Sequence, residues 1–353
     1  MTVSDMRPET ADPGAAAQEV AAIVIGRNEG ARLLGCLESL SARAGRVIYV
    51  DSGSTDGSVT AAAAAGAEIV ALDESRPFTA ARARNAGVAA LEAADPDGRF
   101  RFLQFVDGDC SVAPSWIETA RAFLLKTPGA GVVCGRRSER FPEASIYNRL
   151  CDMEWNTPIG RANACGGDSL MRREAFAGVG GFDPSLIAGE EPDLCFRLRQ
   201  AGWTVWRLDA PMTLHDAAMT RFGQWWRRAI RGGWAFAEGA WRHGSSAERY
   251  NRRSTRSIAI WGLLAPAATL IAALAAFVQP TWLIVVILSA LVHAAMAARI
   301  ALRRRRGFGD PWRYAALYGV FTMLSKPAQA IGMLRFLRHR LLGDAARIIE
   351  YKG

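Results

Sequence analysis

Apolar positions along the chain follow three patterns, one after another. From Val20, short apolar runs alternate with helical stretches, in the order VAAIVIG, EGARLLGCLESLSARA, RVIYVD, SVTAAAAAGA and AEIVALD. This strand-helix alternation predicts a parallel sheet with crossover helices. From Ile258 to Ala298 the chain then has no Asp, Glu, Lys or Arg. A third apolar run, Tyr314 to Ser325, is 12 residues long and is followed by Lys326-Pro327.

The charge-free stretch is long enough for two membrane-spanning helices, since one span needs about 20 mostly apolar residues. Gln279-Pro280 is the natural break, which predicts spans at about 258–278 and 282–302. A buried hairpin of a soluble core is the alternative, but the stretch lacks a polar face with helical period. The third run is short for a span and is interrupted by Lys326-Pro327, so we expect an interfacial or re-entrant helix over about 312–334.

The distribution of charge predicts how the hairpin is oriented in the membrane, and together with targeting signals it divides the chain into domains. Arginines flank the two predicted spans on their outer sides, namely Arg249, Arg252, Arg253, Arg256, Arg299 and Arg303 to Arg306. Both ends of the hairpin should therefore be cytoplasmic. The net charge of +9 lies largely beside these spans and suits an anionic membrane surface rather than nucleic acid. Residues 1–18 lack a secretory signal and are expected to form a flexible tail. We therefore expect a cytoplasmic domain over 19–245. A membrane region over 246–353, which ends in a cytoplasmic tail, is expected after it. The six cysteines form no CxxC pair, which predicts free thiols.

Polar side chains follow the predicted strands, where an open α/β sheet binds its ligands. Arg27, Asn28 and Glu29 follow the first strand, 51–56 the second, and Asp107 and Asp109 follow FRFLQFV. Neither GxGxxG nor GxxxxGK[ST] is present. The acids and arginines instead suit a nucleotide whose phosphates are carried on a metal.

Asp107-Gly108-Asp109 has two interpretations when taken alone. Asp and Gly both favour tight turns. Two carboxylates a residue apart also suit Mg²⁺ or Mn²⁺, which prefer hard oxygen ligands. The rest of the chain has to decide between them.

Five motifs occur in register between Val20 and about His243: IVIGRNEG, VDSGSTDGS, ARARNAG, FVDGDC and CGGDSLMRREAFAGVGGFDPSLIAGEEPDLCFRLRQAGW. Together they resemble the inverting glycosyltransferases of family 2. The resemblance implies the GT-A fold, an α/β fold with a Rossmann-like, mostly parallel sheet, here followed by the transmembrane hairpin and interfacial helices. It also implies a nucleotide-sugar donor and a divalent cation.

The resemblance assigns roles to residues of the donor side. Asp51 is implied to bind the base, although it could instead cap the helix that begins near Asp56. Arg84 and Asn85 match the family's arginine-asparagine pair, which reaches the nucleotide. Asp168 could contact donor sugar hydroxyls or stabilise a turn. The full set expected at the nucleotide sugar is Ile25, Arg27, Glu29, Asp51, Arg84, Asn85, Asp107, Gly108 and Asp168. The expected ligands of Mg²⁺ or Mn²⁺ are Asp107, Asp109 and His215, the last of which could also be a structural histidine.

The acceptor side carries the expected general base. Glu191 aligns with the family's catalytic aspartate, and either Glu191 or Glu190 could take the acceptor's proton. Acids just before Pro192 could instead stabilise a helix dipole. QWWRRAIRGGW resembles the Q-x-x-R-W signature of polysaccharide synthases, but it could equally form an amphipathic helix at the bilayer surface. The residues expected on the acceptor or diphosphate side are Gly167, Asp193, Gln224, Trp226, Arg227 and Arg228.

These features predict a membrane-anchored, metal-dependent, inverting glycosyltransferase. We expect it to move a sugar from UDP- or GDP-sugar to a lipid-linked or membrane-lipid acceptor, on the cytoplasmic face of a bacterial inner membrane that the chain crosses more than once. Exopolysaccharide, lipopolysaccharide or glycolipid biosynthesis is the implied pathway, and no nucleic acid is expected as a partner. Three alternatives remain open: a polyprenyl-phosphate glycosyltransferase, a nucleotidyltransferase and a catalytically inactive sugar-nucleotide-binding scaffold.

Overall fold

A computed structural model describes residues 18–343 of the chain. The tails predicted at the two ends of the chain therefore fall almost wholly outside the described residues. The chain divides into two compact units, residues 1–218 and 219–353. This division lies earlier than the boundary at 245 expected from the sequence, because the helix that follows residue 221 packs with the C-terminal helices. Each unit is described by itself.

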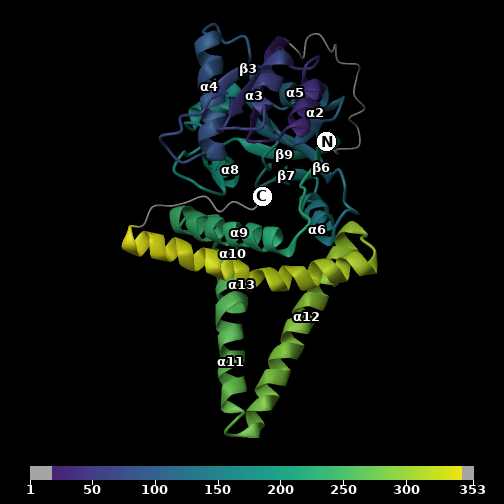
Figure 1. The fold of residues 1–353 in the computed structure, drawn as a ribbon, viewed down its shortest axis with the longest axis vertical. Coiled ribbons are helices and arrows are strands. Elements are labelled where there is room, and N and C mark those ends of the chain that lie inside the picture. Colours follow the sequence, from purple (N-terminus) through teal and green to yellow (C-terminus); the bar gives the residue numbers. More distant parts are fainter. Residues whose placement is uncertain (1–17, 344–353) are drawn as a thin grey trace. The chain divides into compact units, whose positions relative to one another are not determined.

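The first half of the sheet in the first unit is parallel and confirms the strand-helix alternation (Figure 1). Its strands lie in the order β3-β2-β1-β4. Their bounds are β1 Val20–Gly26, β2 Arg46–Asp51, β3 Glu68–Ala71 and β4 Phe102–Asp107. The crossover helices are α2 (Ala31–Leu40), α3 (Ser58–Ala64) and α4 (Ala80–Ala94). β1 and β4 each lie between two other strands, so their apolar runs are buried and polar side chains occur at their carboxyl ends.

The second half makes the sheet mixed. β8 (Ser169–Arg172) lies antiparallel between β4 and β6 (Ala130–Glu139), and β9 (Thr204–His215) pairs parallel with β6. β5 (Cys110–Val112) and β7 (Gly160–Ala162) add to β9 in antiparallel fashion. Further helices among the described residues of this unit are α5 (Trp116–Lys126), α6 (Ile146–Trp155), α7 (Arg173–Gly178) and α8 (Glu190–Gln200). The expected α/β class is confirmed, with the parallel arrangement concentrated in the N-terminal half.

In the second unit, two long helices lie side by side, and a helical hairpin projects from this pair (Figure 1). The long pair is α9 (Phe222–His243) and α13 (Trp312–Leu342). The first arm of the hairpin is α10 (Arg252–Ala259), the π-helical turn η2 (Ile260–Leu264) and α11 (Ala265–Ala275). The second arm is the 3₁₀ turn η3 (Pro280–Trp282) and α12 (Leu283–Phe308).

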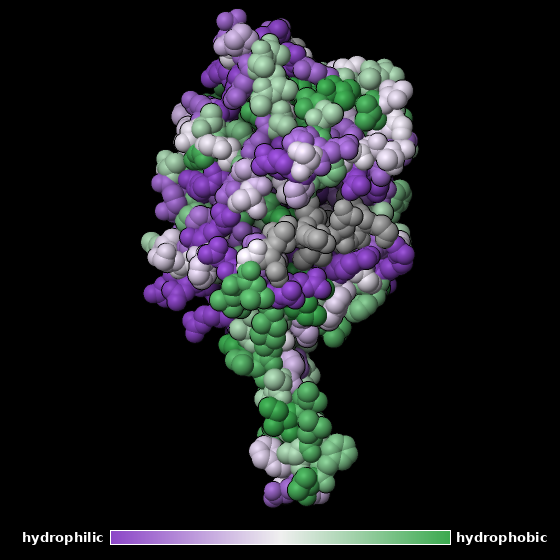
Figure 2. All heavy atoms as spheres, turned by 60° about the vertical axis from the view of Figure 1, so that its left-hand side comes forward, coloured by the Kyte–Doolittle hydropathy of each residue, from purple (hydrophilic) through white to green (hydrophobic). Residues whose placement is uncertain are grey.

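Both arms are long and apolar enough to cross a membrane, over 252–275 and 280–308 (Figure 2). The predicted break at Gln279-Pro280 is confirmed, although the first arm ends at Ala275 rather than at residue 278. The helix expected over about 312–334 is present as α13, which begins at Trp312, runs through Lys326-Pro327 and ends at Leu342. Proline removes one backbone hydrogen bond from a helix, and packing of α13 along α9 and α12 holds the helix together across that gap.

Glycines bring the helices of this unit into close contact. A Cβ atom at Gly332 of α13 would overlap the carbonyl oxygen of Ile230 in α9, and one at Gly233 would overlap that of Gln329. Gly319 of α13 is likewise held against the backbone of α12 at Ala297. Small residues permit this approach of two helix backbones, which lengthens the packed contact between them.

Replacing Gly332 with alanine should therefore destabilise the second unit by about 1–3 kcal/mol or more, since overpacking forces the backbones apart. Gly307 is the matched control, because it is also helical and has no heavy atom within 4 Å of an added Cβ. Gly307→Ala should be neutral or stabilising by up to about 1 kcal/mol through helix propensity. Thermal unfolding of the detergent-solubilised chain measures both. Equal melting temperatures for the two variants would contradict the close crossing.

Candidate active site

The Asp-Gly-Asp sequence forms the tight turn between β4 and β5. The Gly108 N–H donates to the Ile25 carbonyl oxygen at 2.8 Å, and a Cβ at Gly108 would lie 3.2 Å from that oxygen. A side chain at this position would therefore crowd the end of β1, against which the turn lies. The turn interpretation and the metal interpretation are compatible, since the turn fixes the directions of the two carboxylates.

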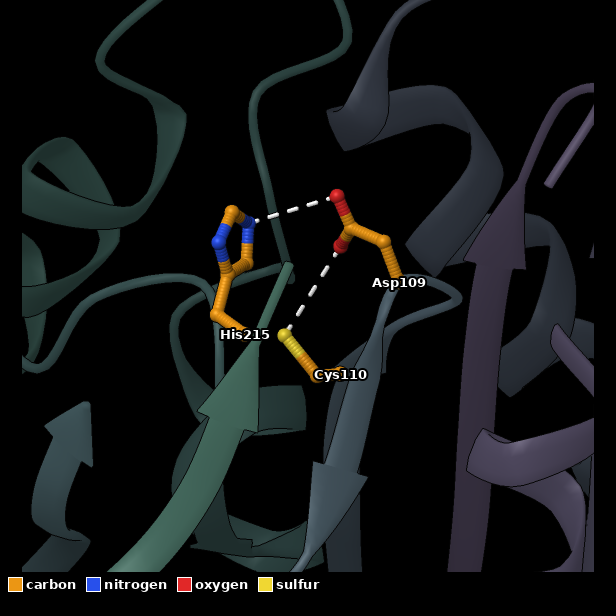
Figure 3. Close-up of side chains that lie close together, drawn as sticks. All are labelled: Asp109, Cys110 and His215. Atoms are coloured by element: carbon orange, nitrogen blue, oxygen red, sulfur yellow. Dashed lines mark hydrogen bonds and ion pairs between the residues drawn. The ribbon is translucent and has the colours of Figure 1, made fainter. Parts of the chain in front are cut away.

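Asp109 faces His215 at one end of the sheet (Figure 3). β5 pairs with β9 so that Cys110 lies opposite His215, which brings the imidazole beside the Asp-Gly-Asp turn. The His215 Nε2 lies 3.3 Å from an Asp109 carboxylate oxygen, and both side chains are buried. The His215 Nδ1 is buried without a hydrogen-bond partner and lies 3.7 Å from the Glu139 carboxylate.

These donors fit a divalent cation. A carboxylate oxygen and an imidazole nitrogen converge on one point, and this donor set suits Mg²⁺, Mn²⁺ and similar ions. The thiol of Cys110 is also near, 3.7 Å from Asp109. Burial raises the pKa of this thiol well above its ordinary value, so it stays protonated and serves as a hydrogen-bond donor.

Asp107 is the centre of an ionic network. One of its carboxylate oxygens accepts from Arg84 at 2.9 Å, and the other lies 3.4 Å from the Arg137 guanidinium. Arg84 also donates to Glu190 at 2.9 Å and is itself buried. The guanidinium of Arg84 therefore connects the first acid of the turn with the first acid of α8.

Asp168 lies beneath this network. Its side chain is fully buried, and it accepts hydrogen bonds from the Asp107 N–H at 3.1 Å and from the Thr213 hydroxyl at 2.7 Å. Of the two roles expected for Asp168, the geometry matches support of the turn, because both carboxylate oxygens face protein donors. Gly167 lies beside it, and a Cβ there would lie 2.9 Å from the Asp107 carboxylate. Gly167 thus belongs to the centre of the site.

Glu190 and Glu191 begin α8, where the helix N-terminus favours negative charge. The Glu191 carboxylate accepts from the Gly166 N–H at 2.8 Å, so the loop before β8 holds it in place. Burial, and then the neighbouring charge of Glu190, raise the pKa of Glu191 to about 7. A carboxyl group with that pKa is suited to accept a proton near neutral pH. Asp193 pairs with Arg197 of its own helix at 2.8 Å, and its role on the acceptor side stays a prediction.

On the donor side, the residues that follow β1 and β2 are tied to one another. Asp51 accepts from the Gly53 and Ser54 N–H groups and from the Tyr49 hydroxyl. Asn28 accepts from the Thr55 N–H at 2.7 Å and so connects the two loops. The carboxylate of Asp51 shapes its own loop in this structure, and its contact with a base stays a prediction.

The other residues expected at the nucleotide sugar contact different parts of the first unit. Asn85 uses both ends of its amide on the backbone of Phe182, so it holds the loop before α8. Arg27 is exposed with its guanidinium 5.7 Å from the Phe78 ring, and Glu29 pairs with Arg32 at 2.8 Å. Ile25 is half-buried at the end of β1. These placements leave Arg27 the most accessible member of the predicted set.

The acceptor-side residues from QWWRRAIRGGW belong to the second unit. The Gln224 side chain accepts from the Thr220 and Arg221 N–H groups at 2.9 Å and caps α9. Trp226 lies 5.6 Å from the Phe222 ring, and Arg227 is exposed. The segment forms a helix, α9, that has both buried and exposed faces, and its location at a bilayer surface stays a prediction. The roles of Gln224, Trp226, Arg227 and Arg228 toward an acceptor stay predictions.

Three residues of this site were missed by the sequence analysis. Arg137 lies 3.5 Å from Asp168 and stacks on the Trp155 ring at 4.8 Å, and that ring contacts His215 at 4.6 Å. Glu139 is the buried carboxylate beside His215. Arg137 and Glu139 are two residues apart on β6 and so share a face of the strand. Charged residues at alternate positions after the apolar run AGVVC were the available signal.

Several known proteins are similar to this chain. The family model described as Glycosyl transferase family 2 matches residues 21–179. The succinoglycan biosynthesis protein ExoA of Rhizobium meliloti is 28% identical over 186 residues, covering 48% of this chain and 54% of that protein. Glycosyltransferase AglE of Haloferax volcanii is 26% identical over 260 residues, covering 69% of this chain and 80% of that protein. The chain thus spans little more than half the length of the first relative.

A solved structure supports the fold. The mannosyltransferase PcManGT of Pyrobaculum calidifontis, determined with GDP-Man and Mn²⁺, is 18% identical with a TM-score of 0.53. The match covers 93% of this chain and 90% of that protein. At this identity the likeness concerns the fold, which is the GT-A arrangement expected from the sequence.

Proposed function

Because residues 21–179 of this chain belong to glycosyl transferase family 2, we propose that the chain transfers a sugar from a nucleoside-diphosphate sugar, with a divalent cation and with inversion, to a lipid acceptor. The proposal rests on the family match and on the arrangement of the site. The family match does not identify the acceptor, the membrane attachment or the cation. Separate features of the chain support these three parts of the proposal.

The observation that carries the proposal is the connection between two groups of acids. Asp107 and Asp109 flank the turn after β4, and Glu190 and Glu191 begin α8. Arg84 donates to Asp107 and to Glu190 at 2.9 Å each, so the two groups are held at a fixed spacing. Transfer from a sugar diphosphate requires charge stabilisation at the diphosphate and a base at the acceptor, and this arrangement offers both.

In the mechanism, Asp109 and His215 would hold the cation, with Asp107 adjacent. A divalent cation there would offset the charge that develops on the departing nucleoside diphosphate. Arg84 and Arg137 hold Asp107 in position, and their positive charges also favour a diphosphate nearby. Glu191 takes the proton of the acceptor hydroxyl as that oxygen forms its bond to the sugar. Displacement of the diphosphate from the opposite side inverts the sugar carbon.

A lipid acceptor and membrane attachment are supported by the hairpin of the second unit. Two helices long and apolar enough to cross a membrane lie at 252–275 and 280–308, with arginines at the two outer ends. The positive-inside rule supports a cytoplasmic location for both ends of the hairpin, and the membrane in this proposal is a bacterial inner membrane. The first relative is named a succinoglycan biosynthesis protein, which supports polysaccharide or glycolipid assembly as the pathway.

The direct test uses the purified chain in detergent with a lipid extract as acceptor. UDP-, GDP- and other sugar nucleotides are screened for nucleoside diphosphate release, with Mg²⁺, with Mn²⁺ and with chelator. Release that needs both a metal and the lipid is the expected result. Pyrophosphate release would identify a nucleotidyltransferase. Donor binding without turnover of any donor would overturn the transferase and favour a sugar-nucleotide-binding scaffold.

The rate should depend on pH through Glu191. A general base must be ionised, and burial raises the pKa of this carboxyl to about 7, so kcat/KM should rise from about pH 6 and level off above about pH 8. An ordinary glutamate has a pKa near 4.5, which would put this rise below about pH 5.5. The shift has a matching effect on stability. The folded chain keeps a proton that the unfolded chain releases, so Glu191 contributes less to stability as the pH rises from about 4.5 through about 7.

The pH profile is measured as nucleoside diphosphate release at low donor concentration in buffers of constant ionic strength. Asp209→Asn is the control, because Asp209 is an exposed carboxylate paired with Arg136 away from the network of Asp107. Its profile should match that of the unmodified chain. A flat profile between pH 6 and 8 would contradict the assignment of a raised pKa to the base.

A further inference from the structure

The start of the first hairpin arm carries a concentrated positive charge. Arg249 lies in the turn before α10, and Arg252, Arg253 and Arg256 lie on the helix; all four side chains are exposed. Within residues 18–343, none of the four forms an ion pair with an acid. Their guanidinium groups are therefore open to a bound anion.

Two hollows of the second unit meet at this cluster. One, of about 670 Å³, is lined by all four arginines together with Glu248, Ser257, Ile260 and Trp261. The other, of about 320 Å³, lies between α9, α10 and α13 and is mainly apolar, with Trp241, Met333, Phe336 and Leu337 in its wall. Arg252 and Arg256 line both. A cationic hollow and an apolar one thus share a boundary made of two guanidinium groups.

The local helix is unfavourable without an anion. Arg252 and Arg256 are four residues apart, so they are neighbours on one helix face and repel each other. Basic side chains at a helix N-terminus also oppose the helix dipole, and α10 has no acid in its first turn and no side-chain cap. A phosphate group placed between the guanidinium groups removes both penalties and accepts paired hydrogen bonds from arginine.

The surroundings favour a lipid as the source of that phosphate. α10 continues through η2 into the apolar arm that ends at Ala275, so the arginines mark the polar end of a candidate span. Trp261 and Ile260 line the same hollow, and tryptophan and arginine at such a boundary match the depth of lipid headgroups. The apolar hollow is suited to the part of the lipid next to its headgroup.

We propose that the chain has a binding site for an anionic phospholipid at the start of α10. Arg249, Arg252 and Arg256 hold the headgroup phosphate, and the wall formed by Met333, Phe336 and Leu337 contacts the first part of an acyl chain. The site is independent of the sugar-transfer proposal, because it involves only residues of the second unit and requires no turnover.

The experiment measures direct binding to the full chain in a neutral detergent, with no sugar nucleotide present. A short-chain phosphatidylglycerol, phosphatidylcholine of the same chain length and inorganic phosphate are the three probes. Two double variants carry the same change of charge: Arg252→Gln with Arg256→Gln, and the control Arg303→Gln with Arg306→Gln near the end of α12. Arg249→Gln lies outside the helix and tests the site without altering α10. Leu337→Gln tests the apolar wall. Thermal unfolding verifies that each variant is folded.

We expect saturable binding of phosphatidylglycerol that is about tenfold or more tighter than that of either other probe. The Arg252/Arg256 variant should lose about tenfold or more in affinity, Arg249→Gln should lose less, and the Arg303/Arg306 control should retain binding. Leu337→Gln should weaken phospholipid binding alone. Equal losses of affinity in the two double variants would mean that phosphatidylglycerol binds through the overall surface charge, and would overturn the proposed site. Inorganic phosphate bound as tightly as the lipid, or phosphatidylcholine bound as tightly as phosphatidylglycerol, would also overturn it.

Discussion

Replacing Glu191 with glutamine should lower the rate of sugar transfer by about 10²–10⁴-fold, the usual contribution of a general base. Glutamine keeps the shape of the side chain and can still accept from the Gly166 N–H through its carbonyl oxygen, so the loop before β8 should stay in place. The change removes only the ability to take a proton. Donor affinity should therefore be close to that of the unmodified chain, and the loss should appear in kcat.

Glu190→Gln is the matched variant, because it makes the same change one residue away. The Glu190 carboxylate accepts from Arg84, so its loss should disturb the position of Arg84 and Asp107. We expect a smaller loss of rate accompanied by weaker donor binding. Rate is measured as nucleoside diphosphate release, and donor affinity by titration without acceptor. A full loss of rate in Glu190→Gln with little effect in Glu191→Gln would reverse the assignment. If neither variant loses activity, the acceptor is a phosphate that needs no base, as in a polyprenyl-phosphate glycosyltransferase.

The parallel half of the sheet could be predicted because local pattern and tertiary environment agree there. β1 and β4 are buried on both faces, so their sequences VAAIVIG and FLQFVD read as mainly apolar runs, with Gln104 as the one polar residue inside them and polar residues at or just after their carboxyl ends. The mixed half was harder to predict. β8 has four residues and β5 has three, and runs of that length have no clear periodicity. Their pairing depends on contacts between residues far apart in the chain.

Helix α13 also shows what the local sequence does not reveal, namely which helices it packs against and how far it extends. The helix expected over about 312–334 contains Lys326-Pro327, although the residue before proline is steered away from helical dihedral angles. The helix continues there, and glycines let α13 pack closely against α12 at Gly319 before that position and against α9 at Gly332 after it. Such packing involves pairs such as Gly332 and Ile230, whose proximity no local pattern reveals.

Within the site, motif positions were predictable but their partners were not. Asp107, Asp109, His215 and Glu191 gather at one edge of the sheet, as expected for residues that follow neighbouring strands or begin a nearby helix. The connection from Glu190 through Arg84 to Asp107 joins residues 106 and 23 positions apart and could not be read from spacing. Asp168 and Asn85 are polar residues in family motifs whose side chains serve the protein's own loops. A motif identifies which residues matter, and the hydrogen bonds determine how each one acts.

Replacing Asp109 with asparagine should abolish most of the metal-dependent activity, by about 10³-fold, because a Lewis-acid cation contributes several kcal/mol to the stabilisation of developing charge. The Asp109 side chain is almost fully buried and lies 3.3 Å from the His215 Nε2. Asparagine retains the size of the side chain while removing its charge. The cation would then be held by His215 and a neutral amide, which attract it far less strongly.

Binding of Mn²⁺ gives a measurement that does not depend on turnover, since the paramagnetic resonance signal of free Mn²⁺ decreases as the ion binds. The unmodified chain should bind the ion in the presence of nucleoside diphosphate, and Asp109→Asn should weaken that binding by at least about tenfold. Asp209→Asn, an exposed carboxylate on the same β9 strand as His215, should leave it unchanged. His215→Ala should weaken binding in the same direction as Asp109→Asn. If both site variants bind Mn²⁺ as tightly as the unmodified chain, the pair of Asp109 and His215 is a structural contact, and the cation must be held by other oxygens beside Asp107.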